Sequence, residues 1–182
     1  MAYNFYAGKM LSQDVDTYVT NGVNAAEAMP NGALVKLGAL ATDATYEVQG
    51  GVEYDVYEAG KPAAATDEVA IVDYAGISEG NIAGNNYRIG HKLYDLQVPA
   101  GTITRVRRLN LHDKFWLAAG NFTEAPTVGK YAVAKATSYL HEPKADLTGN
   151  TDGYAVKILV EKDLTAGMKA EGKQYLCEVV QL

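Results

Sequence analysis

The chain is poor in the residues that build catalytic and metal centres. Cys177 is the only cysteine among 182 residues, which excludes an intrachain disulfide and a zinc site made of several thiolates. There are three histidines and three serines, and the one close pair, Ser138 and His141, lacks the Gly-x-Ser-x-Gly elbow of a hydrolase nucleophile. His91 and His112 have no partner at a known metal-ligand spacing. We therefore expect no catalytic residue, no metal site and no cofactor.

Long hydrophobic runs are also missing. No stretch approaches the roughly 18 uninterrupted apolar residues that a membrane-spanning helix needs. Residues 1–11 lack the basic start and the apolar run that together mark a signal peptide. The sequence thus predicts a protein that is synthesised in a cytoplasm and has no membrane partner.

Basic residues are outnumbered, 16 against 22 acidic residues, and the formal net charge is −6. Such a chain does not bind nucleic acid through its overall charge. Basic residues do concentrate in one stretch, residues 87–114, where Asp95 and Asp113 are the only acids. The basic residues of this stretch are Arg88, Lys92, Arg105, Arg107, Arg108 and Lys114. Two interpretations remain open for this stretch: an arginine-rich surface that docks on an acidic partner, or arginines that pair with the chain's own carboxylates across a sheet.

What the chain does have favours β-structure. It contains 18 glycines and 13 tyrosines, and aromatic residues suit a pleated surface while glycine suits the turns between strands. Long helices are not expected, and the only helical candidate is a short one over Ala25–Met29. Strands are expected at 33–40, 44–48, 52–58, 68–74, 87–98, 102–111, 114–118, 130–136, 154–161 and 174–182, with a loop at 142–153. This pattern predicts a mainly β fold, an antiparallel barrel or sandwich of short strands.

The chain is expected to divide into an N-terminal arm, residues 1–29, and a β-rich body, residues 30–182. The first residues are apolar but follow no strand or helix period, which is typical of an extended segment that contacts another molecule. The arm residues predicted to make such contacts are Tyr3, Phe5, Tyr6, Met10 and Leu11. The body can form one or two β lobes, and a division between lobes is placed in the glycine-rich stretch 76–86.

Several segments resemble, in texture, the small structural proteins that decorate the heads of tailed bacteriophages. These segments are 31–40, 54–72, 128–133 and 175–180. The resemblance implies a β-rich protein without a catalytic site that binds the major capsid protein, associates with itself on the capsid and uses an N-terminal arm to bridge capsid subunits. It implies that the protein is located on the exterior of the virion, after synthesis in the host bacterial cytoplasm.

The leading hypothesis is therefore a non-enzymatic virion protein that binds and stabilises the capsid surface. Its predicted contacts are the arm residues together with Arg88, Lys92, Arg105, Arg107 and Arg108. The alternative is a carbohydrate-binding or host-attachment module in which exposed tyrosines and Trp116 stack on sugar rings. The apolar neighbours of Trp116, Phe115 and Leu117, indicate burial of this side chain instead.

Overall fold

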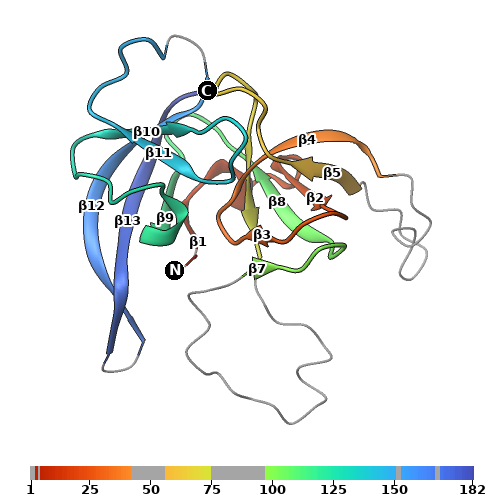
Figure 1. Ribbon diagram of the computed structural model, residues 1–182, viewed down its shortest axis with the longest axis horizontal. Coiled ribbons are helices and arrows are strands. Elements are labelled where there is room, and N and C mark those ends of the chain that lie inside the picture. Colours follow the sequence, from red (N-terminus) through yellow and green to blue (C-terminus); the bar gives the residue numbers. More distant parts are fainter. Residues whose placement is uncertain (1–2, 4, 42–55, 75–96, 151–152, 167–168) are drawn as a thin grey trace.

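A computed structural model gives the fold and describes residue 3 and residues 5–41, 56–74, 97–150, 153–166 and 169–182. The described residues form β-strands and short 3-10 helices, and no α-helix is among them. The strands build a six-stranded sheet and a small closed barrel that lie side by side (Figure 1). The expectation of a mainly β fold with antiparallel sheets is confirmed.

The six-stranded sheet brings the two ends of the chain together. In spatial order its strands are β1 (Phe5–Lys9), β9 (Lys114–Ala118), β13 (Lys169–Gln181), β12 (Ala155–Ala166), β10 (Tyr131–Ala134) and β11 (His141–Lys144). Each neighbouring pair is antiparallel. Alternate side chains therefore point to opposite faces, and Phe115, Leu117 and Cys177 lie on the buried face.

The barrel is built from the middle of the chain. Its strands, in order around the barrel, are β2 (Val19–Val23), β5 (Val56–Gly60), β4 (Leu34–Leu40), β6 (Ala70–Asp73) and β8 (Thr104–Arg108). The pair β2 and β5 is parallel, and the other barrel pairs are antiparallel. A two-residue pair, β3 (Met29–Pro30) with β7 (Gln97–Val98), buries Met29 and Val98 against the barrel core.

One strand of the barrel serves two cores. The run Val69–Val72 is buried throughout, and its continuous apolar sequence is typical of a strand buried on both faces. Ala70 and Val72 pack inside the barrel, whereas Val69 and Ile71 pack into the core beneath the six-stranded sheet. Because strand side chains alternate, a strand that is wedged between two bodies needs apolar residues at every position.

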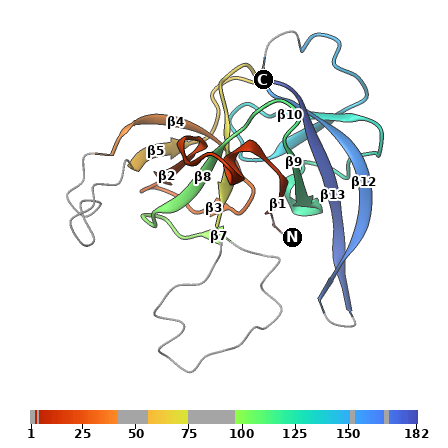
Figure 2. The same ribbon diagram turned by 180° about the vertical axis from the view of Figure 1, so that it is seen from behind.

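The segment 1–29 is not an arm, and this expectation is wrong for the residues that the structure describes. Phe5 is buried against Phe115, with ring centroids 5.7 Å apart, and Met10 is buried in the same core. Both views show β1 alongside β9 (Figures 1 and 2), and β2 completes the barrel. The short 3-10 helices η1 (Leu11–Gln13) and η2 (Asp16–Tyr18) connect the two strands.

Polar contacts hold this leading segment in place. The backbone N–H of Leu11 donates to the Asp113 carboxylate at 2.8 Å, and the Arg107 guanidinium donates to the carbonyl of Ser12 at 2.8 Å. The aperiodic sequence hid this arrangement, because the segment passes from one sheet to another and takes its partners about 100 residues further along the chain.

The division between lobes that was placed within 76–86 falls outside the described residues. The strands on either side of it, β6 and β8, are neighbours in the same barrel, so the change from barrel to sheet that the structure describes lies elsewhere. The chain leaves the barrel after Arg108 and enters the sheet at Lys114.

The expected positions of individual strands, helix and loop agree with the structure only in part. The strand at 114–118 is confirmed, and those at 33–40, 68–74, 102–111, 130–136, 154–161 and 174–182 overlap β4, β6, β8, β10, β12 and β13. Residues 44–48 lie outside the described residues, as do most of 52–58 and 87–98. The short helix over Ala25–Met29 is wrong, because the Asn24 side chain accepts the N–H groups of Ala26 and Glu27 in a turn. The loop expected at 142–153 begins with β11 instead.

Candidate interaction surface

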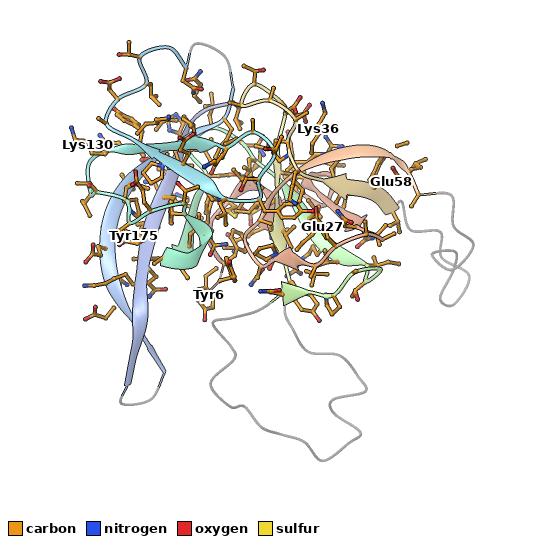
Figure 3. The ribbon with its side chains drawn as sticks, viewed as in Figure 1. Tyr6, Glu27, Lys36, Glu58, Lys130 and Tyr175 are labelled. Carbon is orange, nitrogen blue, oxygen red and sulfur yellow. The ribbon has the colours of Figure 1, made fainter. Side chains whose placement is uncertain are left out.

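The predicted contact residues of the leading segment do not share one surface. Phe5 and Met10 are buried in the core, and Tyr3 is half-buried. Tyr6 is 51% exposed on β1 (Figure 3), and Leu11 is exposed on η1. Only Tyr6 therefore lies on a face where a partner can reach a large aromatic side chain beside other apolar groups.

The arginines of β8 pair with carboxylates of their own chain. Arg105 and Arg107 both contact the Asp73 carboxylate, at 2.7 and 2.6 Å, and Arg108 contacts Glu68 at 3.2 Å. Asp73 stands directly opposite Arg105 in the β6–β8 register, so this pairing is cross-strand. Of the two interpretations of the basic stretch, pairing within the chain holds for these three residues. Arg88 and Lys92 lie outside the described residues.

The outer face of the six-stranded sheet presents a row of apolar side chains. Cross-strand register places Tyr6 opposite Trp116, Trp116 opposite Leu176, and Leu176 opposite Val160. We call these four residues the apolar row. Tyr6 and Val160 are exposed, while Trp116 and Leu176 are half-buried. The row crosses four strands, and cross-strand neighbours share a face, so it forms one continuous surface feature.

The expected burial of Trp116 is corrected by this register. Phe115 and Leu117 are buried, and Trp116 between them points to the opposite face, as strand geometry requires. The Lys162 ammonium lies over the Trp116 ring, 4.3 Å from its centroid. This cation covers one face of the ring.

A second row, rich in lysine, runs beside the apolar row. Its members share the outer face, one on each strand of the sheet, and in spatial order they are Lys9, Lys114, Glu178, Lys157, Tyr131 and Lys144. We call this set the lysine row. Glu178 is its one acidic member and lies 3.8 Å from Lys114. Four lysines against one glutamate leave this part of an acidic protein positively charged.

Beyond β9, strands β12 and β13 continue as a two-stranded ribbon. The pairing of β9 with β13 spans Gln174–Glu178, whereas β12 and β13 remain paired out to Ala166 and Lys169. Figures 1 and 2 show this ribbon extending past the rest of the sheet. Lys173 bridges Glu161 and Asp163, at 2.8 and 3.0 Å, and these hydrogen bonds hold the pKa of Lys173 above its ordinary value. Charged side chains of this kind keep an open strand edge soluble.

A hollow of about 530 Å³ opens on the barrel between β4, β5 and residues 23–26. Figure 3 labels Lys36 and Glu58 near it. Its two lysines are paired with carboxylates of the chain, Lys36 with Asp67 and Lys61 with Glu27, each at 2.7 Å. Both lysines of this hollow therefore form ion pairs within the chain.

The side chains that could act as nucleophiles, bases or metal ligands have structural roles, and most of them are buried. His141 is fully buried, with Nδ1 3.2 Å from the Tyr154 hydroxyl, and Ser138 accepts the N–H of Leu140. Burial raises the pKa of the Cys177 thiol well above its ordinary value, so the thiolate is disfavoured. Across the described ranges, no three His, Cys, Asp or Glu side chains converge as metal ligands. Within the same ranges, no helix is long and apolar enough to cross a membrane.

Comparison of the chain with protein-family models, with curated proteins and with solved structures gives no match in any of the three.

Proposed function

We propose that this protein is a non-enzymatic structural component of a phage particle that binds the exterior of the capsid and stabilises it. The observation that supports this most directly is the β12–β13 ribbon, which extends past its own sheet. Two strands alone are marginally stable in water. A ribbon of this length is therefore suited to pack on a second surface, here the major capsid protein.

The ribbon takes the role that the sequence resemblance implied for an N-terminal arm. Residues 5–29 belong to the sheet, its connecting helices and the barrel, and they are not available to bridge capsid subunits. Residues 161–166 and 169–173 lie beyond the pairing of β9 and β10, and both edges of this part of the ribbon lack a third strand in the described structure. An open edge can pair with an extended segment of another protein.

The alternative of a carbohydrate-binding module rests on Trp116, which lies on the outer face of the sheet. It has less support than the capsid-binding role. A sugar ring that stacks on Trp116 has to displace Lys162 from the ring face or use its other side.

Shortening the ribbon tests the proposed function. We expect a variant in which residues 163–173 are replaced by Asn-Gly to fold, because Lys162 and Gln174 are cross-strand partners and Asn-Gly closes a two-residue hairpin. Its binding to empty phage capsids, measured by co-sedimentation, should fall about tenfold or more.

Lys173→Ala is the matched control, because it removes the ion pairs of the ribbon and keeps its length. Its capsid binding should remain within about threefold of the original protein. Equal capsid binding by the shortened protein would remove the ribbon from the mechanism. Absence of the full-length protein from purified particles, measured by mass spectrometry, would refute the capsid role altogether.

A further inference from the structure

The lysine row is a charged surface that the fold pairs only in part. Lys114 pairs with Glu178 at 3.8 Å and Lys144 with Glu142 at 3.2 Å, whereas Lys9 and Lys157 have no ion pair among the described residues. The exposed apolar row runs alongside it, so a partner that covers both rows excludes water from the lysines and strengthens their attraction for carboxylates. The face therefore fits a partner that combines acidic and apolar side chains.

The chain itself contains a segment of that composition. Between Lys36 and Lys61 there is no basic residue, and there are five acids: Asp43, Glu47, Glu53, Asp55 and Glu58. Apolar and aromatic residues alternate with these acids, as in Val52-Glu53-Tyr54-Asp55-Val56-Tyr57. Its charge is opposite to that of the lysine row, and its aromatic residues suit the apolar row.

The outer sheet face and the strands that flank the acidic segment lie on different sides of the molecule. The strands that bracket the acidic segment, β4 and β5, are on the far side of the barrel from β12 and β13 in both views (Figures 1 and 2). Leu40 and Tyr57 at its two ends are cross-strand partners, so the chain leaves and returns at the same place. We therefore expect a contact between the segment and the sheet face to join two molecules.

We propose that the outer face of the six-stranded sheet binds the acidic segment 43–58 of a second copy of this chain. The contact is head-to-tail, because the sheet face and the strands β4 and β5 that flank the segment lie on different sides of the molecule. Head-to-tail contacts generate rings or open chains and not a two-fold dimer. This proposal is independent of the capsid-binding role of the ribbon, because the ribbon lies beyond the rows that the second copy covers.

Sedimentation velocity of the purified full-length protein tests the proposal. At about 100 μM protein and low ionic strength, we expect species larger than the monomer, which dissociate at about 0.5 M salt because charge attraction is screened. Reversal of two lysines of the row, in Lys114→Glu with Lys157→Glu, should weaken association about tenfold or more. Reversal of two acids of the segment, in Glu53→Lys with Asp55→Lys, should do the same.

The decisive measurement is a mixture of the two reversed proteins. Each reversed surface then meets its complement on the other protein, and we expect association to return to within about threefold of the original. The control is Lys130→Glu with Lys135→Glu, which changes the same charge outside the lysine row and should leave the salt-sensitive association in place. Either a monomer at low ionic strength or a mixture that stays monomeric would overturn the proposal. Binding of single-stranded oligonucleotide to the lysine row of a monomer, in the same assay, would also overturn the proposal.

Discussion

His141 is a titratable side chain held where water does not reach it. It is fully buried between Phe122 and Tyr154, with ring centroids 5.4 and 5.6 Å away. Burial lowers the pKa of His141 to about 3, and a backbone hydrogen bond to Gly32 offsets this only in part. The imidazole is therefore neutral in the folded protein at every pH near neutrality.

This burial predicts a loss of stability on mild acidification. In the unfolded chain His141 takes up a proton below about pH 6.5, whereas the folded protein does not bind it until about pH 3. The contribution of His141 is thus fully present above about pH 6.5, and the free energy of unfolding falls by up to about 1.4 kcal/mol per pH unit below it. Urea unfolding between about pH 7 and 5, above most carboxylate titration, measures this slope.

Two variants isolate the histidine responsible. His141→Gln should flatten the pH dependence even where it lowers stability at every pH, because glutamine does not titrate. His112→Gln should preserve the slope, since the side chain of His112 is 81% exposed. An unchanged slope in His141→Gln would show that another group titrates in this range.

At the scale of the element, β1 shows how one strand divides its residues between core and surface. Phe5 is 4% exposed and Tyr6 is 51% exposed, although the two are adjacent. Phe5→Ala should lower the free energy of unfolding by roughly 3–5 kcal/mol, because it empties a site in the core. Tyr6→Ala should cost about 1 kcal/mol or less, the value of a cross-strand pair with Trp116.

Urea unfolding followed by Trp116 fluorescence measures both effects. The comparison is sharp because the two variants remove aromatic rings of nearly equal size from neighbouring positions. Similar losses from both would mean that the leading segment is not docked as β1, and would revive an extended arm.

Strands with a local signal could be predicted from the sequence, and strands whose pairing is set at long range could not. Lys114–Ala118 is a compact run of aromatic and aliphatic residues between turns, and its bounds were predicted as the structure has them. β1 pairs with that same strand across more than 100 residues, and no local pattern marks such a partner. Residues 162–166 and 169–173 belong to β12 and β13 but fall outside the strands expected at 154–161 and 174–182. Both edges of this part of the ribbon lack a third strand among the described residues, so a one-sided apolar pattern is not needed there.

The candidate site could not be predicted for the same reason. The members of the lysine row come from six strands, and only register brings them together. The arginines of β8 stood out in the sequence because they are close together in the chain. In the structure they pair with Asp73 of the neighbouring strand β6 and with Glu68 just before that strand. The basic residues that cluster along the sequence thus pair within the chain. The unpaired lysines of the row are far apart in the sequence.

At the scale of the whole molecule, barrel and sheet share one core. Leu34 and Ile71 of the barrel pack in the same cluster as Phe115 and Leu117 of the sheet. The Arg107 guanidinium adds a buried contact from the barrel to Ser12 in the segment that leads out of β1. A core that is common to both bodies couples their stability, so we expect them to unfold in a single transition.

The single tryptophan makes this coupling measurable. Trp116 lies in the sheet, and Ile71 is a fully buried residue of the barrel strand β6. Ile71→Ala should lower the free energy of unfolding by roughly 2–5 kcal/mol, and Trp116 fluorescence should report the full loss although the change is made in the other body. Far-UV circular dichroism should give the same midpoint.

Ile103→Ala, at a 38% exposed position next to β8, is the control and should change the free energy of unfolding by about 0.5 kcal/mol or less. If Trp116 fluorescence kept its original midpoint in Ile71→Ala while the circular dichroism changed in two steps, the barrel and the sheet would be independent units, and the shared core would not be the source of their stability.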